Sequence, residues 1–438
     1  MPEMNNRTAA RRSIPARHVA AVVVGNALEF YDFLTYAFFA IYIGRAFFPS
    51  DTPSASLLAA LGTFGVGFVT RPVGSWVIGR MGDRAGRKPA MILTFSLMGA
   101  AIIGLALTPP RSMIGIAAPI LVVIFRMVQG FALGGEVGPT TAFLLEAAPP
   151  ERRGFYTAFQ AWTQHLSNLL SGLVGYVLAS TLNERQLQAY GWRIAFLLGA
   201  LIVPFGLLVR RGLPETLGER DPSQRGRVSM RPYWRVAAIG LLLLGSGTIG
   251  AYTLTYMTTY AITALHMPTG IAFAATIVIS ISGLAFDLIS GVLSDRLGRK
   301  PVMIVPGALL MICIFPAFRW IAHYRTAGAL MAAAAVLASL ASLSVNPILT
   351  WLTESLPMAI RSGGVAVIYA CAIATFGGST QYTVTWLIKR TGNPLMPVWY
   401  WTIAAVIGLA AMFAARETAP RKIAAPEAQP APVPGRSA

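Results

Sequence analysis

Residues 79 to 88 read GRMGDRAGRK, and residues 291 to 300 read GVLSDRLGRK. The two stretches share a first glycine, an Asp-Arg pair and a final Gly-Arg-Lys at the same spacing, and they lie 212 residues apart. Because the pattern returns after nearly half of the 438-residue chain, it indicates an internal duplication.

A second pair of stretches supports the duplication. LLEAAPPERRG at 144 to 154 and LTESLPMAIRSG at 352 to 363 align with an offset of 208. This alignment matches Glu146, Pro149 and Arg153 with Glu354, Pro357 and Arg361. Two halves that repeat in parallel about an axis along the membrane normal are an architecture that transporters use.

The composition of the chain is that of a membrane protein. Hydrophobic residues make up 55% of it, charged residues only 12%, and the mean hydropathy is +0.61, whereas soluble domains carry about twice that charged share. Apolar runs near the roughly 20 residues that span a bilayer recur along the chain. The first run is too long and too acidic for a cleaved signal peptide. Twelve spans are expected, beginning near residues 18, 55, 89, 113, 155, 192, 236, 268, 301, 327, 362 and 397.

The basic residues are distributed unevenly between the loops. The formal net charge is +18, and most of the 35 Lys and Arg residues fall on the side that holds both termini. This asymmetry follows the positive-inside rule and places both termini in the cytoplasm; binding of phosphate groups is the weaker interpretation. The predicted organisation is a basic tail (1–17), a six-helix bundle (18–209), a cytoplasmic linker (210–235), a second six-helix bundle (236–416) and a disordered Pro/Ala-rich tail (417–438).

Several motifs resemble those of one transporter family. The repeated G-x-x-x-D-R-x-G-R-K resembles the loop motif of the major facilitator superfamily. RMVQG at 126 to 130 and LPET at 213 to 216 are similar to its motifs in helix four and after helix six. The resemblance covers about residues 18 to 416. It implies an all-α polytopic membrane protein with twelve transmembrane helices in two pseudo-symmetric six-helix bundles.

A narrower resemblance concerns the first two spans. EFYDF at 29 to 33 with RPVG at 71 to 74 resembles the metabolite:proton symporter family. Within that family the bacterial citrate–proton symporters are most similar, through GFYTAFQ (154 to 160) and WRIAFLLG (192 to 199). This resemblance implies symport driven by a proton gradient, with no other cofactor.

The repeated loop motif also has a physical interpretation. Asp83 can cap the positive N-terminal end of a neighbouring helix, while the basic residues meet lipid phosphates and helix C-termini. Gly79 and Gly86 allow close helix approach and a tight turn. Positive-inside charge alone would account for the arginines but not for an aspartate at matched spacing. The predicted cytoplasmic gating motif comprises Gly79, Asp83, Arg84, Gly86, Arg87, Lys88, Gly291, Asp295, Arg296, Gly298, Arg299 and Lys300.

Charged residues inside the expected spans mark a candidate transport site. Each costs about 2.5 to 3.5 kcal/mol near the centre of a bilayer, so these side chains are expected to face one another, water or a ligand. At about 100° per residue, Asn26 and Tyr36 share one face of the first helix with two of the acids. The charged residues are Glu29, Asp32, Arg71, Arg126, Glu136 and Asp287.

A buried carboxylate can take up the coupled proton, because burial disfavours its charged form. Either carboxylate of the first helix could instead be a fixed partner of an arginine. Asp287 has no acidic counterpart at the offset of 212, where Ser75 stands, and His165 is either a further titrating group or a core histidine. The resemblance places Arg126 near proton coupling. The predicted proton-coupling residues are Glu29, Asp32, Arg126, Glu136 and Asp287.

Arg71 is the main candidate for holding an anionic substrate, because a guanidinium presents a planar fork to a carboxylate. A structural arginine near the membrane interface is the alternative. Glutamines on helices four and five can add neutral hydrogen bonds, although such residues also serve helix–helix contacts. The predicted substrate-binding residues are Asn26, Tyr36, Arg71, Gln129, Gln160 and Gln164.

Several chemistries are not expected from this sequence. It contains no phosphate-binding loop, no H-E-x-x-H and no Cys/His cluster, so ATP-driven transport and a metal site are not predicted. The prediction is a non-enzymatic symporter of the bacterial plasma membrane. It would import an organic anion with protons by alternating access, with a di- or tricarboxylate such as citrate favoured, and work as a monomer without nucleic acid. Shikimate, a 2-oxo acid, proline or betaine stay open as substrates, as do a membrane-embedded enzyme and a sensor without flux.

Overall fold

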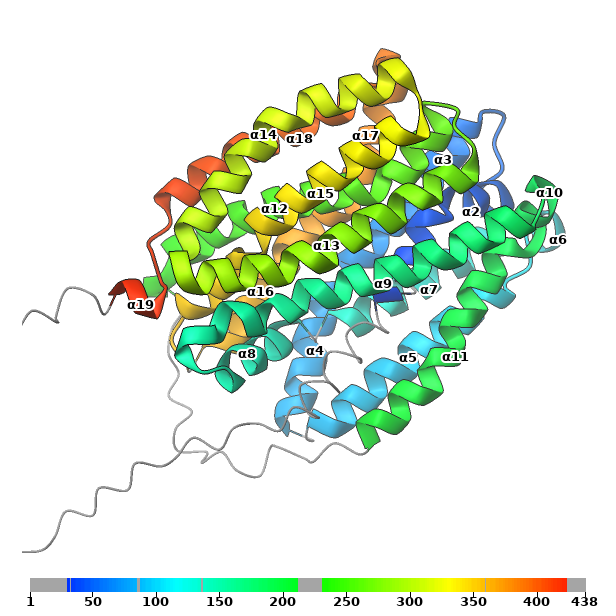
Figure 1. Cartoon of the computed structure of the whole chain (residues 1–438). Coiled ribbons are helices and arrows are strands. Elements are labelled where there is room, and N and C mark those ends of the chain that lie inside the picture. Colours follow the sequence, from blue (N-terminus) through cyan, green and yellow to red (C-terminus); the bar gives the residue numbers. More distant parts are fainter. Residues whose placement is uncertain are drawn as a thin grey trace, which may run out of the picture.

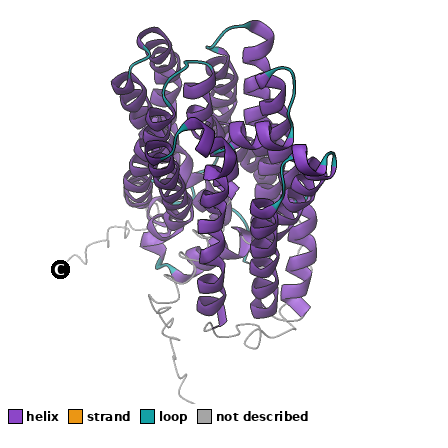
Figure 2. Ribbon diagram, turned by 90° about the vertical axis from the view of Figure 1, so that its right-hand side faces the viewer, coloured by secondary structure: helices purple, strands orange, loops and turns teal. Residues whose placement is uncertain are grey.

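The described part of the chain is built from helices alone. The computed structural model describes residues 30–31, 33–84, 87–134, 137–211, 231–358 and 360–423. Long helices run roughly side by side through the molecule, and none of these ranges contains a strand (Figure 2). The helical form follows from the bilayer, where a backbone must satisfy its own hydrogen bonds.

The first half supplies the helices up to Arg211 (Figure 1). Residues 30–31 and 33–38 are helical and lead into the first labelled helix. The elements are α2 (Ala40–Phe47), α3 (Pro53–Val69), α4 (Arg71–Arg84), α5 (Arg87–Leu107), α6 (Arg111–Ile114), α7 (Ala117–Leu133), α8 (Val137–Ala147), η1 (Pro150–Arg152), α9 (Arg153–Thr181), α10 (Glu184–Gln186), η2 (Leu187–Gly191) and α11 (Trp192–Arg211).

The second half supplies the remaining helices. They are η5 (Arg231–Tyr233), α12 (Trp234–Thr263), α13 (Thr269–Leu297), α14 (Arg299–Tyr324), α15 (Ala327–Glu354), α16 (Arg361–Ala372), η6 (Ile373–Gly377), α17 (Gly378–Thr391), α18 (Met396–Ala414) and α19 (Pro420–Ile423). Within the described ranges, 7 helices are long and apolar enough to cross a membrane, and two shorter apolar helices accompany them. Several expected spans consist of two successive helices, for example α3 with α4.

The two halves pack against each other along α9 and α13, which lie side by side in Figure 1. Two glycines allow this contact. A Cβ atom built on Gly291 would lie 2.8 Å from the carbonyl oxygen of Gly154, and one built on Gly154 would lie 2.8 Å from that of Gly291. Contacts of α16 with α8 and of α17 with α3 also join the halves.

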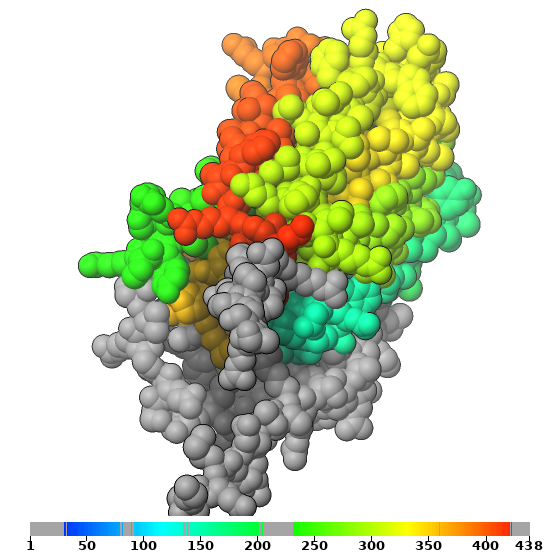
Figure 3. Space-filling view, turned by 60° about the vertical axis from the view of Figure 1, so that its left-hand side comes forward, coloured from blue at the N-terminus to red at the C-terminus, as the bar shows by residue number. Residues whose placement is uncertain are grey.

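The chain after α18 returns to the end of the bundle where α8, η1 and the start of α14 meet. α19 contacts η1, and the red segment crosses this end of the molecule in Figure 3. Glu417 accepts hydrogen bonds from the backbone N–H groups of Arg299 and Lys300, at 2.9 and 3.0 Å. Residues 417–423, which fall within the predicted tail (417–438), belong to the described chain and include the short helix α19.

Candidate functional site

Two arginines are brought together by close packing of α3 against α7. A Cβ atom built on Gly130 would lie 1.5 Å from the carbonyl oxygen of Gly67, so only glycine fits at this crossing. Arg71 is the first residue of α4, two positions after the end of α3, and Arg126 lies one turn before Gly130 on α7. The crossing therefore places both guanidinium groups at the same level of the first half.

Arg71 is buried, with a relative exposure of 4%. Its guanidinium carbon lies 4.6 Å from the centre of the Phe33 ring and 4.3 Å from that of Phe68. Nε and Nη2 of Arg71 have no hydrogen-bond partner among the described residues. Cation–π contacts stabilise the charge in part, but a guanidinium carries five N–H donors. Arg71 thus keeps donors that an anionic ligand can use.

Arg126 is fully buried and lies over the same aromatic cluster. Its guanidinium carbon is 4.5 Å from the ring centres of both Phe33 and Tyr36, and 5.1 Å from that of Phe64. Nη1 donates a hydrogen bond of 2.6 Å to Oε1 of Gln129. Two positive groups therefore share one ring, that of Phe33, and an anion between them would relieve their mutual repulsion.

The second half contributes two tyrosines to this arginine cluster. The Tyr252 ring of α12 lies 5.5 Å from the ring of Phe68. Tyr252 and Tyr369 of α16 both interact electrostatically with Arg71, and Gln164 of α9 lies beside the Tyr369 hydroxyl. Residues of both halves thus meet around Arg71, as alternating access requires of a substrate site.

Two buried side-chain amides, one from each half, lack partners among the described residues. Gln160 of α9 and Gln381 of α17 are both almost fully buried. Neither side-chain oxygen nor nitrogen of these two residues has a hydrogen-bond partner among the described residues. Because buried polar groups in proteins are nearly always paired, these amides are candidates for direct contact with a bound polar molecule.

The predicted site residues are distributed unevenly over the described chain. Tyr36, Arg71, Arg126 and Gln129 come together at the aromatic cluster, and Tyr36 donates a hydrogen bond to the carbonyl oxygen of Ala60. The first-half motif lies on α4 and the start of α5. For five motif members the structure describes the backbone alone: Gly79, Asp83, Arg84, Arg87 and Lys88. The sixth member and four further predicted residues lie outside the described residues altogether: Gly86, Asn26, Glu29, Asp32 and Glu136.

Asp287 lies elsewhere in the seam between the halves. Its Oδ2 atom is 2.7 Å from Nδ1 of His165, which comes from α9 of the first half. The backbone carbonyl of Asp287 accepts a hydrogen bond from the Asn346 side chain of α15, at 2.5 Å. Asp287 and His165 were predicted separately, and the structure brings them together.

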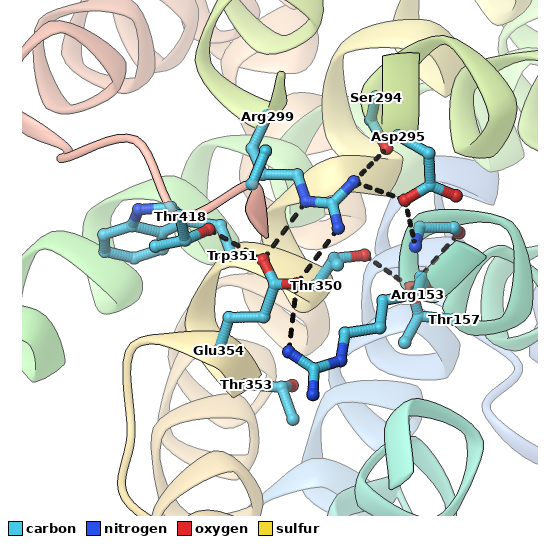
Figure 4. A network of polar contacts seen from close by, with 12 residues as sticks. Arg153, Thr157, Ser294, Asp295, Arg299, Thr350, Trp351, Thr353, Glu354 and Thr418 are labelled. Carbon is cyan, nitrogen blue, oxygen red and sulfur yellow. Dashed lines mark hydrogen bonds and ion pairs between the residues drawn. The ribbon is translucent and has the colours of Figure 1, made fainter. Parts of the chain in front are cut away.

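The second copy of the repeated motif holds the two halves together at one end of the bundle. Asp295 at the end of α13 accepts hydrogen bonds from the backbone N–H groups of Gly154 and Phe155, at 2.8 and 2.9 Å. These N–H groups open α9, where the helix dipole is positive. The Thr157 and Thr350 hydroxyls form a further hydrogen bond across the same seam (Figure 4). The carboxylate therefore caps a helix of the opposite half.

Arg299 connects this cap to a wider network. It is fully buried and binds Asp295 at 2.6 Å and the two Glu354 carboxylate oxygens at 3.1 and 3.0 Å (Figure 4). Arg153 of the first half lies 4.0 Å from Glu354. The guanidinium of Arg299 therefore faces protein, where the carboxylates of Asp295 and Glu354 neutralise its charge.

The repeat relation is visible in the ion pairs themselves. Arg153 of the first half approaches Glu354 of the second, and Glu146 of the first half lies 3.8 Å from Arg361 of the second. Since Glu146 and Arg153 match Glu354 and Arg361 in the sequence repeat, the two pairs are related by the pseudo-symmetry of the halves. Both pairs cross the seam.

The remaining motif residues of the second half have distinct environments. Arg296 is exposed, and Gly298 has a φ of 106°, a conformation that favours glycine. Lys300 donates from Nζ to the carbonyl oxygen of Phe413 at 2.6 Å. Burial raises the pKa of Glu417, but hydrogen bonds from the backbone N–H groups of residues 419, 299, 300 and 418 outweigh it, so that this pKa lies below its usual value.

A small cavity lies away from these groups, among α12, α14, α15 and α18. Its volume is about 30 Å³, and Leu310, Ile348, Trp401 and Met412 contribute apolar surface to it. A cavity of this size holds about one or two water molecules. It is too small for an organic substrate, so the arginine cluster is the stronger candidate site.

Some residues of these sites were not singled out from the sequence. Phe33, Phe64 and Phe68 form the rings beneath the arginines, and aromatic residues in a membrane helix carry no signal of that role. Glu354 and Arg361 were noted only as a repeat of Glu146 and Arg153. Each copy of the repeat carries an acid and, seven positions later, an arginine, and this recurrence was the signal that could have identified the crossed ion pairs.

Comparison with known proteins supports the fold and the class of protein. The family model of the Major Facilitator Superfamily matches residues 22–372. The chain belongs to this superfamily. It is therefore a multi-pass membrane transporter and not an enzyme, as predicted. A solved D-xylose-proton symporter superposes with a TM-score of 0.76 at 19% identity, over 92% of this chain and 98% of that chain, which confirms the predicted major facilitator fold.

Three curated relatives of this superfamily member cover most of its length. The citrate-proton symporter of Salmonella typhi is 34% identical over 90% of this chain and 92% of that protein. The alpha-ketoglutarate permease of Escherichia coli K12 is 34% identical over 87% and 89%. The proline/betaine transporter of the same strain is 32% identical over 92% and 84%. The similarities are too even to select one substrate.

Proposed function

We propose that this transporter couples inward proton movement to the uptake of an organic acid, with a di- or tricarboxylate such as citrate favoured. The observation that carries the proposal is Arg71, a buried guanidinium with two nitrogens that lack a described hydrogen-bond partner. An uncompensated charge inside a membrane costs about 2.5 to 3.5 kcal/mol. A substrate carboxylate would compensate it through charge-assisted hydrogen bonds.

Several buried polar groups besides Arg71 are available to a substrate with more than one polar group. Arg126 lies over the same Phe33 ring, and the Gln160 and Gln381 amides lack described partners. A tricarboxylate or a keto dicarboxylate can engage several such donors at once. Two of the relatives are named for citrate and alpha-ketoglutarate, which are acids of this kind.

A zwitterion such as proline or betaine is the second candidate. One relative is a proline/betaine transporter, and aromatic rings bind quaternary ammonium groups. The rings of Phe64, Phe68 and Tyr252 are aromatic groups of the kind that bind such a cation. However, Arg71 already lies over Phe68, and Arg126 lies over Phe64. A cationic substrate group would be repelled by these arginines, so the carboxylate is favoured.

Transport would proceed by alternating access in the plasma membrane, with the end that carries Asp295 and Glu354 facing the cytoplasm. The crossed ion pairs and the helix cap by Asp295 join the halves at that end. In the proposed cycle, protonation of an acid within the membrane, with Glu29 and Asp32 as sequence candidates, frees an arginine for substrate. Separation of the halves then breaks the network and releases substrate and proton.

The test is uptake by the purified protein in vesicles under an imposed pH difference, acidic outside. Labelled citrate, 2-oxoglutarate, proline and betaine are compared at equal concentration, with a protonophore as the control for coupling. Accumulation of an acid that the protonophore abolishes supports the proposal. Accumulation of betaine alone would replace the organic acid by the zwitterion, and transport unaffected by the protonophore would refute proton coupling.

A further inference from the structure

A histidine and an aspartate from opposite halves meet in the seam between α9 and α13. His165 Nδ1 lies 2.7 Å from Asp287 Oδ2, and their side chains are exposed by only 21% and 1%. The position of the imidazole depends on Gly283, since a Cβ atom built there would lie 2.3 Å from the His165 ring. The pair is therefore held by α9 on one side and by α13 on the other.

The Asp287 carboxylate is only partly satisfied. Its Oδ2 atom binds His165, while Oδ1 has no hydrogen-bond partner among the described residues. Asn346 of α15 fixes the neighbouring backbone through its bond to the Asp287 carbonyl. A structural carboxylate of a membrane core is expected to have both oxygens bonded. The spare oxygen distinguishes this site from the Asp295 cap, where both oxygens accept hydrogen bonds.

Among the described residues, the other charged groups of the seam have partners away from this pair. Asp287 is the charged group that acts on His165. The ion pairs at the Asp295 end take up the charged groups of the neighbouring helices. They include Glu146 of α8, Glu354 of α15, Arg153 at the start of α9, Asp295 at the end of α13 and Arg299 at the start of α14. Two titratable groups of α12 and α16, Tyr252 and Tyr369, interact with Arg71. A third, Tyr256 of α12, accepts a hydrogen bond from Thr385.

Contact between the halves would change how many protons this pair holds. With the seam closed, an imidazolium bound to a carboxylate is net neutral, so one dissociable proton is favoured in an apolar environment. When the seam opens, each group becomes hydrated and loses its partner. The imidazolium can then release its proton into a solution near neutral pH.

We propose that His165 and Asp287 form a proton-binding site whose occupancy follows the separation of the two halves, and that this site couples proton movement to transport. The inference rests on the proposed function as a proton-coupled transporter. It assigns the coupled proton to a pair that spans the seam, in place of the first-helix carboxylates. The repeat does not supply a second copy of Asp287, because Ser75 stands at the offset of 212.

A neighbouring contact links this pair to the arginine cluster. Gln164, the residue before His165 on α9, lies beside Tyr369, and Tyr369 interacts with Arg71. A shift of α9 relative to α13 would therefore change the His165–Asp287 distance and the surroundings of Arg71 together. This shared helix gives the substrate and the proton a physical route to influence each other.

The experiment compares two activities in the same reconstituted vesicles. Counterflow exchanges internal for external labelled substrate without a gradient, whereas accumulation requires proton coupling. Asp287→Asn and His165→Gln should retain counterflow but lose accumulation under an imposed pH difference, so that internal and external substrate concentrations become equal. His323→Gln, which removes an exposed histidine of α14, is the matched control and should accumulate normally.

A reversed pair tests the interaction itself. The double variant His165→Asp with Asp287→His restores one acid and one imidazole across the seam and should regain accumulation that each single change abolishes. Normal accumulation by both Asp287→Asn and His165→Gln would overturn the proposal and direct attention to Glu29 and Asp32. Loss of counterflow together with accumulation in correctly folded single variants would also overturn it, because the pair would then be structural. Absence of proton-driven accumulation by the unaltered protein would instead refute the proposed function.

Discussion

Replacing Asp295 by asparagine tests whether the second-half motif holds the Asp295 end of the transporter closed. The carboxylate accepts two hydrogen bonds from the backbone of the opposite half, at 2.8 and 2.9 Å. Hydrogen bonds to charged groups contribute about 1.5 to 3 kcal/mol each, and neutral ones about 0.5 to 1.5 kcal/mol. Asparagine keeps one carbonyl acceptor, so at the lower end of these ranges the closed state should lose about 2 kcal/mol. The ratio of closed to open molecules should then fall about thirtyfold.

A buried reporter can measure this change even when the open state is rare. Thr350 is buried on α15 at the seam and bonds Thr157 of the opposite half. In a background without Cys313 and Cys371, Thr350→Cys should react with a thiol reagent only when the halves separate. If opening is in rapid equilibrium, the labelling rate follows the open population. Asp295→Asn should therefore accelerate labelling about thirtyfold by the same free-energy arithmetic.

Arg296→Gln is the matched control for this experiment, because it removes an exposed charge from the neighbouring position of the same motif. It should leave the labelling rate unchanged. An Asp295→Asn variant that labels no faster than the parent would refute the role of the helix cap. Equal acceleration by Arg296→Gln would show that general charge at this end, and not the cap, controls opening.

Three further predictions concern binding, stability and pH. Arg71→Lys should weaken substrate binding by about tenfold or more, because it keeps the charge but loses the planar fork; unchanged affinity in calorimetry would contradict direct contact. Glu354→Gln leaves buried Arg299 under-compensated and should destabilise the fold by about 3 to 5 kcal/mol, whereas Arg45→Gln, which removes one member of the exposed Arg45–Glu184 ion pair, should cost less than about 1 kcal/mol; equal shifts in thermal unfolding would contradict this ranking. Since the pKa of Glu417 is lowered on folding, its docking contributes fully above the usual carboxyl pKa and is lost as the pH falls through the lowered value. Hydrogen exchange in residues 415–423, corrected for intrinsic rates, should show that loss on acidification, and Glu417→Gln should abolish the pH dependence; unchanged protection in this variant would contradict it.

Much of the fold could be predicted from the sequence because it depends on local composition and on repetition. Apolar runs of bilayer length specify helices wherever they occur. The repeated GxxxDRxGRK pattern showed that two similar halves exist. The sequence also predicted that Arg71 and Arg126 face the protein interior, because charges inside apolar spans require polar or aromatic surroundings.

The sequence by itself determined that carboxylates and arginines recur at matched positions, but not which of them meet. Asp295 contacts Gly154 across 141 positions, and His165 contacts Asp287 across 122, in each case between halves. Neither helical period nor repeat offset relates such residues, since each pair depends on how the two halves are docked. Only the tertiary structure decided that Glu146 faces Arg361 and Glu354 faces Arg153, because that crossing arises when two similar surfaces pack about their pseudo-symmetry axis.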